Sequence, residues 1–397
     1  MGLSELVKKN IYISDICSAI KRYEHNRIVH SLIRDTSEID PIKNYSSFKD
    51  IIRYYKNHNQ NEFEFADLRY SGESRLYGHL DALYKYVGIT KTNYLAFPKV
   101  EHGVNPTIDA VPKDKIQFYS NFIFQSNYKK NQIHSINKLK PVFSVGPYIH
   151  YANLVYDKNE YVKIKEQFGK ILLVFPFHTF EKTTSNASNE IFVNYVMNVL
   201  AKQYDTVMVS VYWNDVESKL YGMFEKCGAI LVSSGFRGDK AFISRLKTLI
   251  SLSDCVCGNA FGTHIGYAMY LNKPFIYINN DLIFEYSNQK FSEKQTETLQ
   301  KTNQIVEEAF SVNAKNSNCT VKQRQMYDYF WGGNDCIKTQ QEMEAIIKIG
   351  ENILTLSHGN TSKFDNAVEY LLSDSELSEI QREQLLDSLD LLHESFI

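Results

Sequence analysis

Polar side chains that can bind anions or move protons follow the short apolar runs of this chain. Turns and helix caps account for the Asn, Asp, Ser and Gly residues at such places. They account poorly for imidazole and guanidinium groups, which turns do not favour. We therefore single out a set of candidate anion ligands, which are His178, Thr179, Arg237, Asn259, Gly262, Thr263 and His264.

The segment Asn259–His264 is the most informative of these places, because a helical pattern follows it directly. Gly262 lets the backbone approach a ligand closely, and Thr263 and His264 then lie at the start of the helix. Unpaired N–H groups and the helix dipole attract phosphate at such a position. The segment predicts a nucleotide phosphate site, and the alternative is a plain connection from strand to helix.

A second combination lies in the N-terminal half, where Glu101-His102-Gly103 follows a predicted strand. A carboxylate beside an imidazole can bind or deprotonate a hydroxyl group. The alternative is a buried ion pair that closes a turn, and the residues alone leave both open.

Several other chemistries are disfavoured by the sequence. The chain has neither the Gly-x-Gly-x-x-Gly pattern of dinucleotide enzymes nor a P-loop, and the six cysteines lack zinc-ligand spacing. No Asp-x-Asp motif ends a predicted strand, so we expect neither a metal nor another cofactor. With 44 basic against 46 acidic residues the net charge is −2, which argues against nucleic acid as a partner. No apolar run reaches the ~18–20 residues of a membrane span, and we expect a cytoplasmic protein.

The elements that must position these residues are clearest between residues 170 and 278. Short apolar runs alternate there with helical patterns, which is typical of a doubly wound parallel sheet. The predicted strands are 171–175, 206–212, 229–233, 255–258 and 275–278, and the predicted helices are 189–202, 215–227, 239–252 and 262–271.

The rest of the chain suggests a second α/β lobe and a helical tail. Helical patterns (14–32, 47–58 and 73–86) precede strand-like runs (94–98, 118–125 and 141–145) in the first half. We therefore predict an N-terminal lobe over residues 1–155, a nucleotide-binding lobe over 165–330 and a helical extension over 335–397, with Tyr151–Gly169 as a polar linker. The amphipathic stretch 374–392 either packs on a lobe or docks on a partner or membrane surface.

The motifs along this order resemble a known group of proteins. They are Phe175-Pro-Phe-His-Thr179, Gly235-x-x-x-Asp239, Asn259-x-x-Gly-Thr-His-x-Gly-Tyr267 and Lys273-Pro274, with Gly146-Pro-Tyr-Ile-His-Tyr151 at the lobe junction. They resemble bacterial surface-polysaccharide glycosyltransferases of GT-B fold, and most closely the retaining β-Kdo transferase module of lipopolysaccharide O-antigen synthases. Phe236 stands where the resemblance would place a histidine.

The resemblance implies a GT-B-like fold of two Rossmann-like lobes, CMP-β-Kdo as donor, and a glycan or lipid-linked glycan as acceptor at the inner membrane face. It also implies a metal-independent double displacement with an aspartate nucleophile, a role to which we match Asp239. His264 and Glu101 are the other catalytic candidates. Arg237, His178 or Lys273 would neutralise the donor anions, and Glu101, His102 and Tyr148 would face the acceptor.

Two alternatives remain open at this point. The same fold could use a UDP-sugar, a GDP-sugar or CMP-sialic acid. The chain could also be a non-catalytic, glycan-binding module of a polysaccharide assembly complex.

Overall fold

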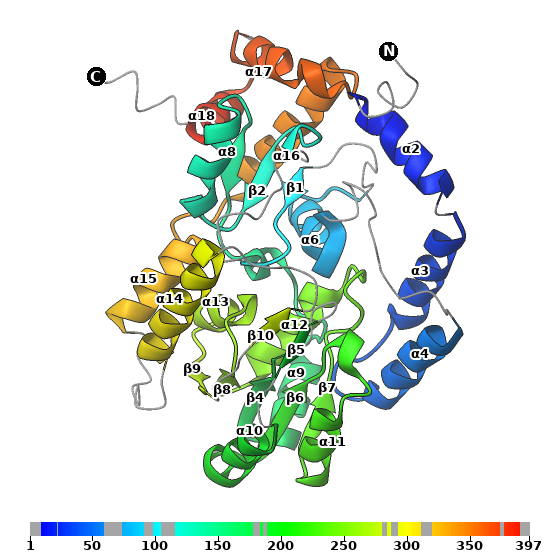
Figure 1. Ribbon diagram of the computed structural model, residues 1–397, viewed down its shortest axis with the longest axis vertical. Coiled ribbons are helices and arrows are strands. Elements are labelled where there is room, and N and C mark those ends of the chain that lie inside the picture. The colour runs from blue at the N-terminus through cyan, green and yellow to red at the C-terminus, as the bar shows by residue number, and fades with distance from the viewer. Residues whose placement is uncertain are drawn as a thin grey trace.

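The structure is a computed structural model with two α/β lobes and helices along one side (Figure 1). It describes residues 9–21, 23–58, 74–90, 98–104, 116–177, 183–185, 189–279, 284–286, 293–310, 320–373 and 377–389. His178, Thr179 and most of the predicted strand 94–98 lie outside these ranges.

The larger sheet has five parallel strands in the order β7-β6-β4-β8-β9. Numbered along the chain within this lobe, the order is 3-2-1-4-5, the order of a Rossmann fold. Helices cover both faces, which is why the strands consist of unbroken apolar runs. The strands are β4 (Ile171–Phe175), β6 (Thr206–Ser210), β7 (Ile230–Val232), β8 (Cys255–Gly258) and β9 (Phe275–Tyr277), which confirms the five predicted strands.

The connections of this lobe also follow the predicted pattern, with one exception. Residues 158–168 form a helix, whereas the sequence analysis predicted a linker over 151–169. Asp157 and Glu160 form a capping box at its start. The elements are α9 (Lys158–Phe168), α10 (Asn189–Tyr195), η4 (Val196–Leu200), η5 (Ala201–Gln203), η6 (Trp213–Asp215), α11 (Lys219–Lys226), α12 (Phe242–Leu252) and α13 (Thr263–Tyr270).

The smaller sheet is parallel as well, in the order β1-β2-β3. Its lobe contains η1 (Leu76–Gly78), α6 (His79–Tyr86), β1 (Lys99–Val100), β2 (Phe122–Phe124), η2 (Asn127–Lys129), α8 (Lys130–Ile136), β3 (Val142–Ser144) and η3 (Tyr148–Tyr151). The predicted fold class, two α/β lobes with parallel sheets and a helical C-terminal region, is confirmed. This is the arrangement expected of a GT-B-like protein.

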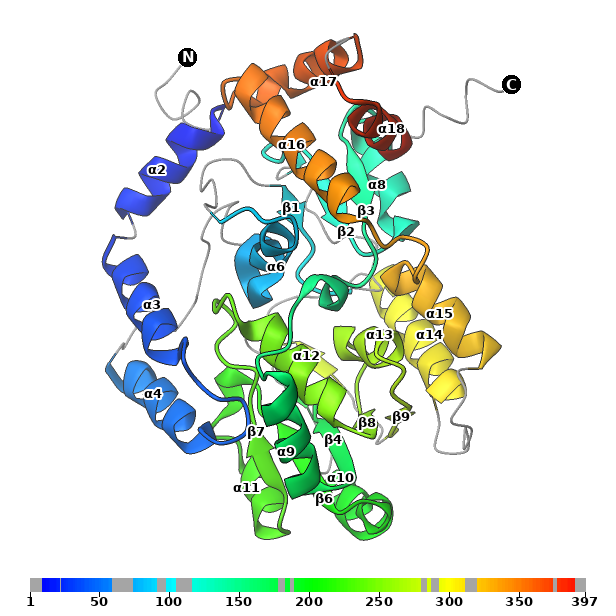
Figure 2. The ribbon, with the colours of Figure 1, turned by 180° about the vertical axis from the view of Figure 1, so that it is seen from behind.

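The two ends of the chain each complete the opposite lobe. From the N-terminal end, α3 (Tyr23–Thr36) and α4 (Tyr45–His58) pack on the larger sheet, where Leu32 and Phe48 share a core with Val174 and Val209. From the C-terminal end, α16 (Gln340–Leu356), η7 (Thr361–Lys363), α17 (Phe364–Ser373) and α18 (Glu379–Ser388) belong to the smaller lobe (Figures 1 and 2).

The predicted domain boundaries at 155 and 335 therefore do not describe this division. The Lys130 ammonium group donates to the carbonyl oxygen of Asp387 (2.5 Å), which ties α18 to α8. Leu385 and Ser388 of α18 are buried, so the described part of the amphipathic stretch 374–392 packs on a lobe. The remaining elements are α2 (Ile11–Lys21), the antiparallel pair β5 (Thr183–Ser185) and β10 (Phe284–Tyr286), α14 (Glu293–Phe310) and α15 (Val321–Trp331).

Candidate functional site

The strand order of the larger sheet marks the place where a ligand is expected. From β4 the chain adds β6 and β7 on one side and then β8 and β9 on the other, so the strand order reverses between β4 and β8. Ligands of such sheets bind beyond the carboxyl ends of the strands at that point. The loops after these two strands meet there, because the Phe177 N–H donates to the Asn259 side-chain oxygen (2.7 Å). Asn259 is buried, and its oxygen joins the two loops. We use the name β4/β8 crevice for the carboxyl edge of these two strands and the segments that meet there, where such folds bind their ligands.

The N-terminus of α13 forms one wall of this crevice. Gly262 is its N-cap residue and has no side chain to cap the helix. The His264 ring stacks on Phe175 (4.8 Å between centroids, 21° between planes) and lies 5.5 Å from the Phe275 ring. A Cβ atom on Gly262 would lie 2.8 Å from that imidazole. Glycine at position 262 therefore leaves the space that the His264 ring occupies.

The loop after β1 approaches the same helix from the other lobe. The Val104 N–H donates to the Thr263 hydroxyl (3.1 Å). A Cβ atom on Gly103 would lie only 2.6 Å from that hydroxyl oxygen. The structure thus brings the predicted group 101–103 to the predicted group 262–264. The Thr263 side chain joins the two lobes here.

Glu101 lies in this loop and forms a buried ion pair with Lys129, as one of the two interpretations of the sequence expected. Both side chains are nearly inaccessible, with 4% and 3% of their areas exposed. Among the residues that the structure describes, the contact of the second Glu101 oxygen is a long one of 3.4 Å with the Gln125 N–H. The Glu101 carbonyl oxygen lies 3.1 Å from His79 Nδ1, and burial lowers the pKa of His79 to about 4. His79 is therefore a neutral hydrogen-bond donor at physiological pH.

Asp239 is held in a second buried ion pair, in the other lobe. Its Oδ2 accepts from Arg245 (2.9 Å) and its Oδ1 accepts from the Ala241 N–H (2.8 Å). The Arg245 guanidinium also donates to the Ser37 carbonyl oxygen (2.6 Å), which ties the N-terminal helices to this lobe. Both oxygens of Asp239 thus have structural partners, and the hypothesis that it is a nucleophile stays a prediction.

Arg237 contributes a cation beside an aromatic surface. Its guanidinium carbon lies 5.4 Å from the centre of the Trp213 ring, and its carbonyl oxygen accepts from the Tyr77 N–H (2.6 Å). Tyr77 has φ +62°, a left-handed conformation that is uncommon outside glycine. Its hydroxyl is hydrogen-bonded to that of Tyr212, and burial raises the pKa of both groups.

The sequence analysis did not select Tyr77, Tyr212 or Trp213 as site residues. Trp213 carried a signal, because it directly follows a predicted strand. Tyr77 carried none, because a left-handed conformation in a tyrosine cannot be foreseen from composition or spacing.

Two predicted residues lie in the wrong place for their roles. Tyr148 is fully buried and donates its hydroxyl to the Ile123 carbonyl oxygen (2.8 Å), so it cannot stack on an acceptor sugar. Lys273 precedes β9 and therefore lies at the amino edge of the sheet, across from the crevice. At that edge the Asp254 carboxylate interacts electrostatically with the Lys273 ammonium group. His102 is half-buried in the loop after β1, and His178 and Thr179 lie outside the described residues.

Two features are absent from the residues that the structure describes. No group of three or more His, Cys, Asp and Glu side chains in them is placed to hold a metal ion. No helix in them has the length and apolar character needed to cross a membrane.

Comparisons with known proteins give only distant likenesses. No protein-family model and no curated protein matches the sequence. Among solved structures, UGT89C1 of Arabidopsis thaliana aligns with a TM-score of 0.29 and 8% identity over 74% of this chain and 64% of that one. This chain therefore spans less than two thirds of the length of UGT89C1.

UGT2 of Phytolacca americana, complexed with UDP-2fluoro-glucose and pterostilbene, aligns with a TM-score of 0.27 and 12% identity over 75% of this chain and 68% of that one. Its apo form gives the same score and identity over 75% and 70%. At these scores the likeness does not establish a shared fold or activity, so the site has to be interpreted from its own residues.

Proposed function

We propose that the protein is a glycosyltransferase that binds a nucleotide-sugar donor in the β4/β8 crevice. One observation carries the proposal: the N-terminus of α13, whose N-cap is a glycine, lies at the point where the strand order reverses, and the loop after β1 of the other lobe contacts it. A helix N-terminus suits a phosphate group, and a crevice between two lobes lets the second lobe present an acceptor.

For the donor we propose CMP-β-Kdo or a related CMP-sugar acid, such as CMP-sialic acid. Such a donor carries one phosphate and one sugar carboxylate. The α13 N-terminus with His264 would take the phosphate. To the sugar carboxylate we assign Arg237, whose guanidinium lies against Trp213. A guanidinium can pair with a carboxylate through two parallel hydrogen bonds.

For the catalytic carboxylate we propose Glu101, with Asp239 as the competing hypothesis. Glu101 belongs to the loop that contacts α13, and one of its oxygens makes only a 3.4 Å contact. A carboxylate at this position can take a proton from an acceptor hydroxyl or attack the anomeric carbon. A retaining double displacement requires the second of these roles, in which the bond from the anomeric carbon to the CMP phosphate breaks as the carboxylate attacks and the acceptor hydroxyl then displaces the carboxylate.

The acceptor, the stereochemistry of transfer and the metal dependence follow from the proposal of a CMP-β-Kdo donor. We propose that the acceptor is a glycan or lipid-linked glycan of a bacterial surface polysaccharide, that transfer retains the anomeric configuration, and that no metal takes part.

Thermal shift with CMP, UDP and GDP tests the donor class, followed by transfer assays with CMP-β-Kdo and CMP-sialic acid. We expect stabilisation by CMP, because ligand bound only to the folded state raises the melting temperature. Stabilisation by UDP or GDP instead would favour the alternative donors. Stabilisation by none of the three would favour the non-catalytic, glycan-binding module.

A further inference from the structure

Helices α2 and α3 form a strap (residues 11–36) along the outside of both lobes (Figures 1 and 2). Its start is fixed to the smaller lobe, because the Ile11 N–H donates to the Gly359 carbonyl oxygen (2.9 Å). Its end is fixed to the larger lobe, where Val29 and Leu32 are buried in the core. Since each end is anchored, the outer face of the strap has a defined position on the molecule.

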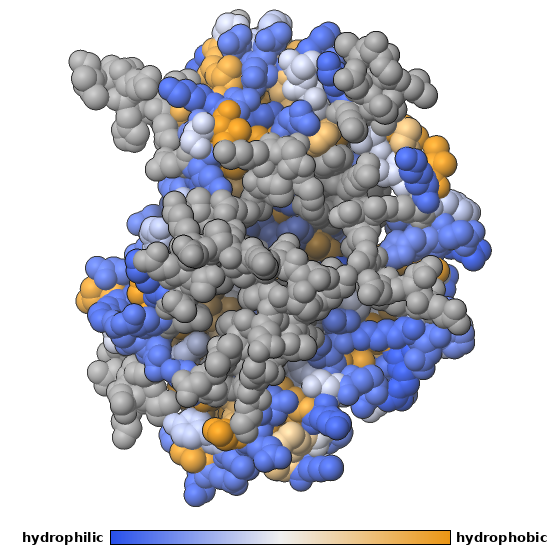
Figure 3. All heavy atoms as spheres, viewed as in Figure 1, coloured by the Kyte–Doolittle hydropathy of each residue, from blue (hydrophilic) through white to orange (hydrophobic). Residues whose placement is uncertain are grey.

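An apolar stripe covers the first half of that face. Ile13, Ile16, Ile20 and Tyr23 are 41%, 53%, 70% and 67% exposed. Their spacing of three and four residues places the isoleucines on one side of α2. Figure 3 shows hydrophobic atoms over α2 at the upper right edge, with hydrophilic atoms over α3 below them. Adjacent large apolar side chains at this exposure indicate an interaction surface.

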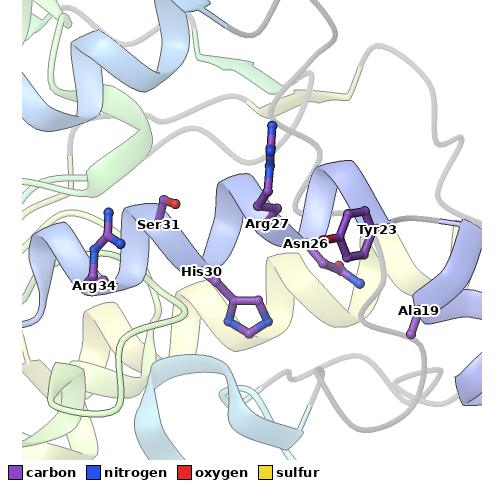
Figure 4. Close-up of a pocket in the computed structure, with 7 residues that line it drawn as sticks. All are labelled: Ala19, Tyr23, Asn26, Arg27, His30, Ser31 and Arg34. Atoms are coloured by element: carbon purple, nitrogen blue, oxygen red, sulfur yellow. The ribbon is translucent and has the colours of Figure 1, made fainter.

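A cationic pocket continues the stripe into α3. It is an open depression of about 530 Å³, lined by Ala19, Tyr23, Asn26, Arg27, His30, Ser31 and Arg34, with no acidic side chain among these residues (Figure 4). Tyr23 belongs to both the stripe and the pocket, so the two surfaces are continuous.

The two arginines of the pocket form only exposed ion pairs with other described residues. Arg27 pairs with Glu24 and Arg34 with Asp35, each at 3.1 Å, and the arginine side chains are 67% and 76% exposed. Exposed ion pairs of this kind contribute little, so both guanidinium groups can exchange partners for an anion.

The charge of the segment differs in sign from that of the whole chain. Residues 11–36 contain four basic residues (Lys21, Arg22, Arg27 and Arg34) against three acidic ones (Asp15, Glu24 and Asp35), a surplus of one positive charge, whereas the chain has −2. An apolar stripe beside a basic surface is the combination that binds the interface of a membrane with anionic lipids.

We propose that the strap docks the protein on an anionic lipid surface. The stripe enters the headgroup region, and Arg27, His30 and Arg34 contact lipid phosphates. This inference is separate from the proposed activity, because it uses none of the residues of the β4/β8 crevice. In the amphipathic tail stretch, considered above for such a role, the described residues Leu385 and Ser388 are buried against the smaller lobe.

Co-sedimentation of the full chain with vesicles tests this proposal. The vesicles contain phosphatidylcholine alone or a mixture with phosphatidylglycerol, at low and high salt. We expect at least tenfold stronger partition onto the anionic vesicles, and a loss of that preference at high salt. A wild-type protein that does not bind anionic vesicles at low salt overturns the proposal.

Two variants and two controls distinguish the contribution of the apolar stripe from that of the pocket arginines to vesicle binding. Ile16→Ser/Ile20→Ser should lower partition about tenfold on both kinds of vesicle. Arg27→Gln/Arg34→Gln should lower it only on anionic vesicles. The matched controls are Val321→Ser, at a position 73% exposed, and Arg53→Gln, with a side chain 45% exposed.

Each control should bind as the wild type does, and circular dichroism should show all variants folded. Strap variants that bind like the wild type contradict the proposal. Analytical ultracentrifugation provides a second test. If the wild type is a dimer that does not bind vesicles and the strap variants are monomers, the strap is a contact between two copies of the chain and the proposal is contradicted.

Discussion

The two buried ion pairs have the same chemistry but different surroundings. In the larger lobe, the Asp239 carboxylate uses both oxygens within its own lobe, and its partner Arg245 binds the carbonyl of Ser37. In the smaller lobe, Glu101 pairs with Lys129, and its loop contacts α13 across the crevice. Burial and pairing are common to both, so they do not identify a catalytic carboxylate. Both loops also contact the opposite lobe, because the Tyr77 N–H donates to the Arg237 carbonyl oxygen two residues before Asp239. The contacts of the oxygens distinguish the two carboxylates: both Asp239 oxygens accept hydrogen bonds of 2.8–2.9 Å, whereas the second Glu101 oxygen has a 3.4 Å contact with the Gln125 N–H.

The largest effect is expected for Glu101→Gln on turnover. If Glu101 acts as a base or nucleophile, kcat should fall by roughly 10²–10⁴-fold. The comparison uses a temperature at which circular dichroism shows both the variant and Asp239→Asn folded, because each loses a charge from a buried pair. Turnover by Glu101→Gln close to that of the wild type contradicts this assignment.

Asp239→Asn should instead act on stability. Leaving Arg245 buried without its anion costs about 3–5 kcal/mol, measured as the free energy of unfolding in urea, while the folded variant keeps its turnover. The double variant Asp239→Asn/Arg245→Met should regain part of the loss, because it removes the uncompensated cation.

A different outcome would favour the competing hypothesis. Asp239→Asn that is as stable as the wild type, binds CMP and transfers no sugar would identify Asp239 as the nucleophile. Mass spectrometry of the wild type with donor alone should then show a covalent sugar adduct on that residue.

Acid should destabilise the Glu101 region through His79. The pKa of His79 is about 4 in the folded protein and ordinarily near 6.5, because burial disfavours the charged imidazole. Between these values the unfolded state binds more protons, so stability falls as the pH falls from 6.5 to 4, by up to about 3 kcal/mol. In His79→Asn, which has an amide donor but no titration, this pH dependence of the unfolding free energy should be smaller. An unchanged slope would rule out His79 as its source.

The smallest expected effect is that of chelation. The described residues provide no cluster of metal ligands, and we propose a donor site in which the α13 N-terminus and Arg237 neutralise the anions. Transfer in excess EDTA should therefore equal transfer without it. Activity that is lost in EDTA and restored by Mg²⁺ or Mn²⁺ contradicts the proposal.

The sequence could predict the strands and most connections of the larger lobe. Strands buried on both faces require continuous apolar runs, and those runs are visible without a structure. Helix α9 was missed because only Ile164 in it is buried, which leaves a mostly polar segment with little periodicity. Amphipathic patterns show that α3 and α16 bury one face, but they do not show on which lobe.

The candidate site was predictable only in part. The segment 262–264 is predicted because a glycine followed by a helix start is a local signal; α13 does begin there, and its binding role stays a prediction. The partners of Glu101 and Asp239 depend on tertiary contacts, and Lys129 lies 28 residues from Glu101. The placement of Lys273 failed for a topological reason, because a residue that precedes a strand lies at the amino edge of a parallel sheet.

Titration calorimetry with CMP on the wild type, His264→Ala and Lys273→Ala decides whether the donor binds in the β4/β8 crevice. We expect the wild type to bind CMP and His264→Ala to lose about 1.5–3 kcal/mol of binding free energy through a missing bond to a charged phosphate. Lys273→Ala, at the opposite edge of the sheet, should bind as the wild type does. A wild type that does not bind CMP, or a His264→Ala variant with unchanged affinity, would contradict the placement of the donor in the β4/β8 crevice.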